Sequence, residues 1–575
     1  MVDHFNLISD PWIPCVSADG KSVELSLREL FAQATELRGI TGDIPQQVMP
    51  ILRIALAVLY EAYADRRGTC EEMSDLWMEV WEGDGFDMAR IDAYLSRYED
   101  RFDLLDASKP FFQTPDLQYT AKDLDPLDVL IADVPKAERA LFTMRSGDGI
   151  DAVSFAEAAR WLAFIQAYDT AGIKSPVVGN TQVTNNKVYA PKGAVGTGWL
   201  GAIGGIFVEG DNLFQTLVLN WVLYDPSSGD DDDVLLGRPG DEAPWRKDEA
   251  PTPDMVIQGR FHGVVDALTL QSRRVRLIAD EERTRIIGCV VCYGNIVHAY
   301  DNNGDEQMTA WYLSPNQAKK LGRSAGSEPL MPRTYDPSRN LWRGLAPILQ
   351  ASEERHRELR PGVIAWLGEM QHYAGWHSDD HLFGCVTLHA QGMAYGTQSS
   401  VFDASIDDSL RIASVMFRDD YDGVKVLLDV IDRTDKAIRA LADFVRNLHT
   451  AAGQCTASQA ARYDVIESAY AQMDAMFRDR IARFDKSQDA ERYGKQWRDD
   501  VHRALLTMAQ RYLDQSPAQA FGAHMPDGRN GKGGIMTSGR ALLELRGALN
   551  ATLGIIATPE TTSENNKTEG DDNDQ

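Results

Sequence analysis

The most distinctive feature of the sequence is an absence. No Asp or Glu occurs in the 39 residues from Thr170 to Val208, although 86 of the 575 residues are acidic. At that average frequency, about six acidic residues would fall in a stretch of this length. The stretch contains Lys174, Lys187 and Lys192 together with several glycines, on a chain of net charge -28. This pattern predicts a flexible surface from which carboxylates are excluded so that an anion can approach, and nucleic acid is the first candidate.

Long hydrophobic runs are also missing. The most apolar helical stretch, near Ile51–Tyr60, is interrupted by Arg53, and the first ten residues carry two Asp. We therefore expect neither a signal peptide nor a membrane span. The six cysteines are too scattered for a disulfide framework, which favours a reducing, cytoplasmic location.

Basic residues are few, because 58 Lys and Arg stand against 86 Asp and Glu. This balance argues against a protein that coats nucleic acid indiscriminately, since such binding needs a summed positive field. It allows local contact through loops without acids, and three further acid-free windows are His381–Phe402, Gln307–Ser327 and the weaker Gly528–Leu543. Two of these windows contain lysines that could contact phosphate. They are Lys187 and Lys192 in Thr170–Val208, and Lys319 and Lys320 in Gln307–Ser327.

Apolar periodicity predicts helices early in the chain, and Val- and Ile-rich runs predict strands after them. The expected helices are residues 45–63, 71–97, 154–168 and 212–223, and the expected strands lie within 255–297. Past Asp408, four amphipathic stripes follow one another, and such helices are most simply buried against each other. The predicted fold class is α+β, with a mixed α/β N-terminal domain (1–405), a C-terminal four-helix bundle (406–556) and a disordered acidic tail (557–575).

Two motifs resemble cofactor or metal sites but favour simpler interpretations. Gly196–Gly201 matches the G-x-G-x-x-G pattern, yet it lies in a glycine-rich stretch and Asp225 is a loose match to the acid expected ~20 residues later, so a flexible loop is favoured. Cys289 and Cys292 have the spacing of half a zinc knuckle, but no second such pair exists. The apolar run around them suits small buried side chains. We expect no cofactor and no metal.

The best enzyme-like cluster is His377, Asp379, Asp380 and His381. Adjacent His and Asp residues can hold a divalent metal that activates water for phosphoester cleavage. No companion His/Asp motif at helical spacing occurs elsewhere, and a polar connection after a helix explains the cluster equally simply. A metal-dependent nuclease therefore stays an alternative to a non-enzymatic protein.

A second acid-free segment has a different character. After a strand-like run ending near Gly396, the residues Thr397, Gln398, Ser399 and Ser400 supply uncharged hydrogen-bonding groups. A glutamine offers both a donor and an acceptor and can enter a groove of DNA without a charge to desolvate. The segment therefore fits a tip that reads or wedges a base pair, and a plain hairpin tip is the other interpretation.

Several motifs together resemble one family, the large subunit (CasA) of the type I-E CRISPR surveillance complex Cascade. They are FNLISDPWIPC near the N-terminus, KPFFQT, LTLQSRRVRL, QMTAWYLSPNQAKKLG, DPSRNLWRGL and AYGTQSSVFDASIDD. The resemblance implies a non-enzymatic subunit at one end of an RNA-guided complex, beside the 5′ handle of the CRISPR RNA and other Cascade subunits. It also implies recognition of the protospacer-adjacent motif in double-stranded DNA, opening of the duplex and recruitment of a helicase-nuclease.

The resemblance also assigns residues. The family's glutamine wedge falls on Gln398, between Thr397 and Ser399, and the family's glycine loop falls on Gly172 to Ser175. Lys174 and Ser175 replace the later glycines of that loop, so that Lys174 is expected to reach a phosphate instead. The loop that docks beside the RNA handle falls on Phe142, Thr143, Met144 and Arg145.

Overall fold

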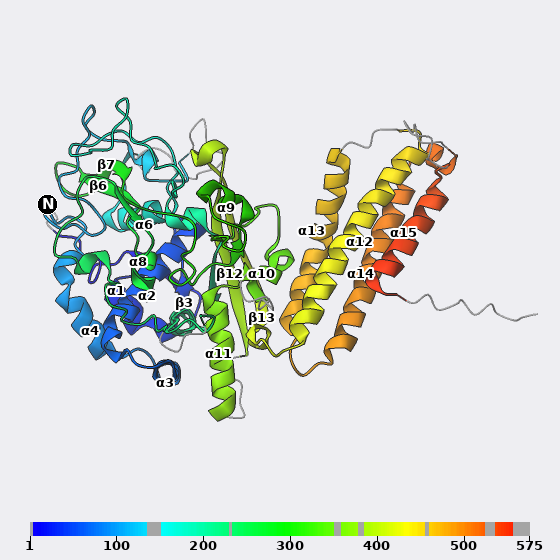
Figure 1. Ribbon diagram of the computed structural model, residues 1–575, viewed down its shortest axis with the longest axis horizontal. Helices are drawn as coiled ribbons and strands as arrows, with labels where there is room; N and C mark the ends of the chain where they lie inside the picture. The colour runs from blue at the N-terminus through cyan, green and yellow to red at the C-terminus, as the bar shows by residue number, and fades with distance from the viewer. Residues whose placement is uncertain are drawn as a thin grey trace, which may run out of the picture. The chain divides into compact units, whose positions relative to one another are not determined.

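The structure is a computed structural model that describes residues 4–134, 151–228, 233–349, 358–377, 384–454, 459–523 and 535–555. It divides into two compact units, of which the first is Met1–Val424 with Ile481–Asp485 and the second is Lys425–Arg480 with Lys486–Gln575. The first unit mixes helices with small sheets and the second is helical (Figure 1). This is the α+β class predicted from the sequence. The predicted boundary at 405/406 lies inside the strand β13 (Phe402–Ala413).

One helix forms the centre of the N-terminal unit. Every residue of α2 (Val48–Ala62) from Met49 onward is buried, so the helix needs apolar neighbours all round. Arg53 in its middle is 2% exposed and pairs with both oxygens of Glu306 at 3.0 and 2.8 Å. Within the described residues, the other α-helices of this unit are α1 (Leu27–Ala32), α3 (Cys70–Trp81), α4 (Met88–Arg97), α6 (Phe155–Tyr168), α7 (Leu213–Leu219), α8 (Val264–Leu268), α9 (Pro315–Leu321), α10 (Ala346–Leu349) and α11 (Gly362–His377).

The helices expected from periodicity are present, with one division. The predicted helix 71–97 is two helices, α3 and α4, because Gly83 and Gly85 separate them. Each has its own start signal: Thr69 forms a capping box with Glu72, and the side chain of Asp87 accepts from the amide of Arg90. These caps satisfy amides that a helix terminus would otherwise leave unpaired.

The described part of the N-terminal unit also contains five small sheets. Their orders are β2-β1-β3, β10-β9-β11, β13-β12-β4, β5-β8 and β6-β7. The strands are β1 (Ile13–Ser17), β2 (Ser22–Leu25), β3 (Leu37–Ile40), β4 (Gly205–Glu209), β5 (Val256–Gly259), β6 (Arg273–Ala279), β7 (Ile286–Tyr293), β8 (Asn295–Val297), β9 (Trp311–Leu313), β10 (Leu330–Pro332), β11 (Glu358–Leu359), β12 (Cys385–Tyr395) and β13. The predicted strands within 255–297 are thus β5 to β8.

The sheet β13-β12-β4 contains the two longest strands of the described residues, β12 and β13. β12 pairs antiparallel with β13 on one side and with β4 on the other. Side chains alternate between the two faces of a strand. In this register His389, Gln391 and Asp407 therefore lie on one face, and Ala390 and Asp408 lie on the opposite face.

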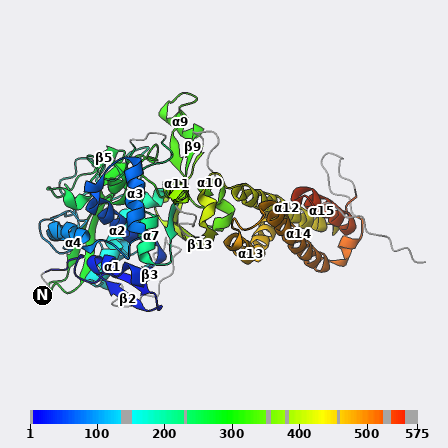
Figure 2. The ribbon, with the colours of Figure 1, turned by 90° about the horizontal axis from the view of Figure 1, so that it is seen from below.

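Four long helices lie in the C-terminal unit as far as the structure describes it: α12 (Gly423–Ala451), α13 (Gln459–Arg483), α14 (Ala490–Asp514) and α15 (Ser538–Leu553). They lie side by side in both ribbon views (Figures 1 and 2). Phe477 of α13 packs on Trp497 of α14 with ring centroids 4.8 Å apart. Arg433 of α12 donates to the carbonyl of Thr552 on α15 at 2.9 Å.

Among the described residues, no helix combines the length and apolar character that crossing a membrane requires.

Candidate nucleic-acid interface

A tight loop joins β12 to β13 and carries Gln398. The amide of Gly396 donates to the carbonyl of Val401 at 3.0 Å and closes the loop. Gln398 and Ser399 both have left-handed backbone conformations, with φ of 57° and 54°. Two successive non-glycine residues in this region are unusual and store strain, which is a feature of functional loops. The loop holds the exposed Gln398 side chain at the tip of the hairpin.

The glycine loop lies directly beside this hairpin tip. Gly172 follows α6, and the amide of its neighbour Ala171 donates to the carbonyl of Ser399 at 2.8 Å. A Cβ built on Gly172 would meet only Thr170 Oγ1 at 3.6 Å and Ser400 O at 3.9 Å, which is ordinary contact. Two segments more than two hundred residues apart in sequence therefore form one surface, and Gly172 is open within it.

A buried ionic network fixes the base of the glycine loop. Arg273, fully buried, binds the carboxylate of Asp169 and donates to the carbonyls of Thr170 at 3.1 Å and Gly196 at 2.7 Å. Lys174 Nζ lies 2.5 Å from Asp169 Oδ2, and the Lys174 side chain is only 11% exposed. This inward contact argues against the phosphate contact expected for Lys174, because its ammonium is already used inside the protein.

The electrostatics of this network follow from burial and charge. Burial alone would raise the pKa of Asp169, but the charges of Lys174 and Arg273 and their hydrogen bonds outweigh it, so that the pKa lies below its ordinary value. Burial lowers the pKa of Lys174, and Asp169 opposes that shift. The carboxylate therefore stays ionised at neutral pH and holds two cations at the foot of the loop.

With Lys174 turned inward, the loop presents Ile173. Its side chain is 55% exposed, among the most exposed large apolar side chains of the described residues. Tyr293 supports the same turn from below, because its hydroxyl lies 3.0 Å from the carbonyl oxygens of both Ala171 and Gly172. Sequence reasoning singled out the lysine and missed Ile173. Neighbouring side chains such as Ile173 and Lys174 point to opposite sides of an extended backbone. Only the position of Asp169 in the structure shows that Lys174 is the one that points inward.

A pocket of about 310 Å³ opens beside Gly172, Ser175 and Ser400. Two carboxylates line it, and both are paired: Asp169 with Lys174 and Arg273, and Asp125 with Lys122 and with the Tyr119 hydroxyl at 2.5 Å. The surface around the two loops therefore presents no unpaired carboxylate in the described part of the pocket, which is the condition for an anion to approach.

The acid-free stretch has two different halves. Residues 181–187 and Lys192 are exposed, and Lys187 lies at a turn where Asn185 and Asn186 are left-handed. The second half, from Val195 to Val208, is mostly interior: Trp199 and Leu200 are each 2% exposed. The prediction of a flexible loop at Gly196–Gly201 is wrong, because the backbone there is packed tightly against α6. A Cβ on Gly198 would come within 2.3 Å of the Ala167 backbone.

The lysines of the Gln307–Ser327 window lie at one end of α9. Lys319 and Lys320 are exposed in its last turn, where the helix dipole favours positive charge. Gly322 ends the helix in a left-handed conformation. These lysines are thus available for contacts with a partner.

Other residues singled out from the sequence lie outside the described part of the chain. They are the docking loop Phe142, Thr143, Met144 and Arg145, and Asp379, Asp380 and His381 of the acidic cluster, whose first member His377 ends α11. Cys289 and Cys292 are buried in β7, and burial raises the pKa of both thiols. Among the described residues, no group of three or more His, Cys, Asp or Glu could hold a metal ion.

The fold has counterparts in solved structures of CRISPR-associated proteins. The structure of Thermobifida fusca Cse1 superposes with a TM-score of 0.82, at 32% sequence identity, and the match covers 96% of this chain and 98% of that one. A chain of a CRISPR RNA-guided surveillance complex shares the fold with a TM-score of 0.64 at 16% identity, covering 96% and 100% of the two chains.

Sequence comparison gives the family. The model described as CRISPR-associated protein Cse1 matches residues 6–508. The CRISPR-associated protein CasA/Cse1 of Thermus thermophilus is 26% identical over 411 residues, which is 70% of each chain. The chain belongs to the Cse1 (CasA) family, the large subunits of the type I-E Cascade complex, which confirms the resemblance identified from the sequence motifs.

Proposed function

We propose that this chain is a non-catalytic subunit that recognises the protospacer-adjacent motif in duplex DNA, opens the duplex beside it and recruits the helicase-nuclease. The observation that carries the proposal is the hydrogen bond from the Ala171 amide to the Ser399 carbonyl. It joins the glycine loop and the glutamine tip into one carboxylate-poor surface, so both can act on the same stretch of DNA. The CRISPR RNA 5′ handle and other Cascade subunits would supply the remaining contacts.

The division of work follows from what each loop presents. Gly172 lets the backbone approach base edges in a minor groove only ~6 Å wide. Ile173 would lie beside those edges, and the exposed lysines Lys187, Lys192, Lys319 and Lys320 would hold phosphates without reading sequence. Gln398, with Thr397 and Ser399 beside it, would enter at the first target base pair so that the guide RNA can begin to pair.

Ser175 lines the pocket beside the glycine loop and would contact the sugar-phosphate backbone there. In this proposal Lys174 positions the loop through Asp169 and does not touch DNA. Minor-groove readout is degenerate, so several adjacent motifs rather than one should be tolerated.

The test is the rate of strand opening in the assembled complex. Unstacking a base step costs on the order of a few kcal/mol, which the wedge must offset. We therefore expect Gln398→Ala to slow R-loop formation by roughly tenfold to a hundredfold, measured by a fluorescent base analogue at the first target pair. Weak duplex association should persist.

The matched control is Ser405→Ala, an exposed side chain on the neighbouring strand β13, which should leave the rate unchanged. An unchanged rate for Gln398→Ala would remove the wedge role.

The alternative function, a metal-dependent nuclease, rests on His377, Asp379, Asp380 and His381. Incubating the purified chain with DNA and Mn²⁺ or Mg²⁺ separates the two. The subunit proposal predicts no cleavage, and cleavage that disappears in an Asp379→Asn and Asp380→Asn double variant would establish the nuclease instead.

A further inference from the structure

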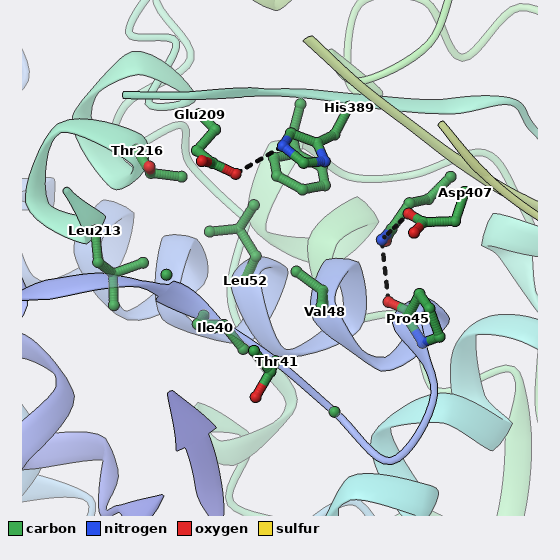
Figure 3. Close-up of a pocket in the computed structure, with 14 residues that line it drawn as sticks. Ile40, Thr41, Pro45, Val48, Leu52, Glu209, Leu213, Thr216, His389 and Asp407 are labelled. Atoms are coloured by element: carbon green, nitrogen blue, oxygen red, sulfur yellow. Dashed lines mark hydrogen bonds and ion pairs between the residues drawn. The ribbon is translucent and has the colours of Figure 1, made fainter. Parts of the chain in front are cut away.

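A separate pocket of about 270 Å³ lies between the sheet β13-β12-β4 and the N-terminal half of α2 (Figure 3). The sheet contributes Glu209, His389, Gln391 and Asp407, from three different strands. None of these residues belongs to the glycine loop or to the hairpin tip.

The rim of this pocket is acidic. Glu209 and Asp407 both line it, and His389 Nε2 lies 2.6 Å from Glu209 Oε2. The ring of Phe207 stacks on His389 at 4.7 Å and fixes its orientation. Outside the pocket, Arg38 is 3.7 Å from Glu209 but 61% exposed, so it only partly compensates the carboxylate.

Gln391 gives the pocket a second polar feature. Its Nε2 donates to Pro45 O at 3.0 Å and to Asp407 Oδ1 at 2.9 Å, which fixes the orientation of the amide. The side chain is 2% exposed, and within the described structure its Oε1 has no hydrogen-bond partner. A buried acceptor without a donor is costly. The pocket therefore holds two carboxylates and one acceptor without a donor, Gln391 Oε1.

Apart from the hydroxyls of Thr41 and Thr216, the remaining side chains of the lining are apolar. Val48 and Leu52 of α2, Ile40 of β3 and Leu213 of α7 face the polar side (Figure 3). A suitable occupant thus carries several N–H donors, a positive charge and an aliphatic stem. The arginine side chain has all three: five donors in a rigid planar fork and a methylene stem that packs on apolar surface.

We propose that this pocket receives an arginine side chain of another protein subunit of the assembly, which rests on the proposed role of the chain as a subunit. The guanidinium would bind Asp407 and donate to Gln391 Oε1, while its stem packs on Val48 and Leu52 and Glu209 adds negative charge at the rim. A protein partner fits better than nucleic acid, because the two carboxylates repel phosphate.

The test measures the affinity of the full-length chain for the guide-RNA complex that lacks it, immobilised through its other subunits. The double variant Glu209→Gln and Asp407→Asn keeps shape and removes both charges, and should weaken binding about tenfold or more. Asp407→Lys, which places an ammonium of the chain's own at the rim, should weaken it further. Asp403→Asn is the matched control, because Asp403 is exposed on the same strand and does not line the pocket.

Unchanged melting temperatures would show that the variants fold. Equal binding of wild type and variants would overturn the proposal, and tighter binding of the neutral variant would also overturn it in favour of a nucleic-acid contact. Failure of the proposed function differs, because then the wild-type chain itself would not join the complex. When saturated with pocket variant, the complex should form R-loops at the normal rate, unlike one with Gln398→Ala.

Discussion

The two halves of the acid-free stretch share the lack of Asp and Glu but lie in opposite environments. The half around Ile173, Lys187 and Lys192 is exposed beside the hairpin tip, whereas the half around Trp199 lies in the core beside α2. Acidic residues are excluded from the second half because an unpaired buried carboxylate is costly. In the first half burial gives no such reason, and the DNA contact that we propose for this surface would supply one. One compositional signal thus has two physical causes, which only the environment separates.

The largest effect should come from the buried half. Trp199 is 2% exposed and its indole N–H donates to Glu306 Oε2 at 2.6 Å. Trp199→Ala should lower the free energy of unfolding of the N-terminal unit by about 3 to 5 kcal/mol, through lost packing and a cavity. Urea unfolding followed by tryptophan fluorescence would measure this loss. Tyr189→Ala, at an exposed position of the other half, should change it by less than about 0.5 kcal/mol.

The network that joins the two halves should come next. Asp169→Asn leaves Lys174 and Arg273 as buried cations without a counter-ion, and we expect a loss of stability of about 3 kcal/mol. The pKa of Asp169 is lower in the folded protein than in the unfolded chain. The ionised carboxylate therefore stabilises the folded state at pH values above the unfolded pKa, which is near 4. This stabilisation is lost as the pH falls below 4 and passes through the lower pKa of the folded state.

We expect the loop to open as Asp169 is protonated, and hydrogen exchange at the Ala171 amide, which bonds to Ser399, would report this opening as the pH falls below about 4. The Asp169→Asn variant should lose that pH dependence. Retention of the same acid-induced opening in the variant would show that another group controls the loop.

An intermediate effect is expected at Gly172. A Cβ there would make only ordinary contacts in the folded protein, so Gly172→Val should leave the melting temperature nearly unchanged. If the backbone approaches the bases, the same change should weaken motif-dependent DNA binding by roughly 1 to 3 kcal/mol. Binding by the assembled complex to duplexes with and without the motif would measure this difference. Full binding by the variant would place the DNA elsewhere.

Much of the architecture could be predicted from the sequence, because helices with strong apolar periodicity reveal themselves locally. The four C-terminal helices, α2 and α6 were all visible in this way. The division between α3 and α4 was not predicted, although Gly83 and Gly85 lie between the two helices. The apolar periodicity continues on both sides of these glycines and conceals the short break.

The assembly of the interface could not be predicted from local patterns. The bond between Ala171 and Ser399 joins distant segments, and no local pattern specifies that pairing. Nor does the sequence indicate that Lys174 turns toward Asp169, because the loop is irregular and its alternation has no fixed phase. The family resemblance pointed to Gly172 and Gln398, and the structure added how they are held and that Ile173 is the exposed neighbour.

The smallest effect should distinguish lysines by their environment. Lys187 and Lys192 are exposed, so changing both to Gln should reduce the dependence of log K on log salt by about 0.9 for each lost phosphate contact. The preference among motifs should stay the same, because phosphate contacts carry no sequence information. Lys174→Gln is the informative contrast: its ammonium is paired inside the protein, so it should lower stability and leave the salt dependence unchanged. DNA binding by the double variant and by Lys174→Gln, each measured over a salt series, tests this contrast. A reduced slope of log K against log salt for Lys174→Gln would mean that the Lys174 side chain leaves Asp169 to bind DNA.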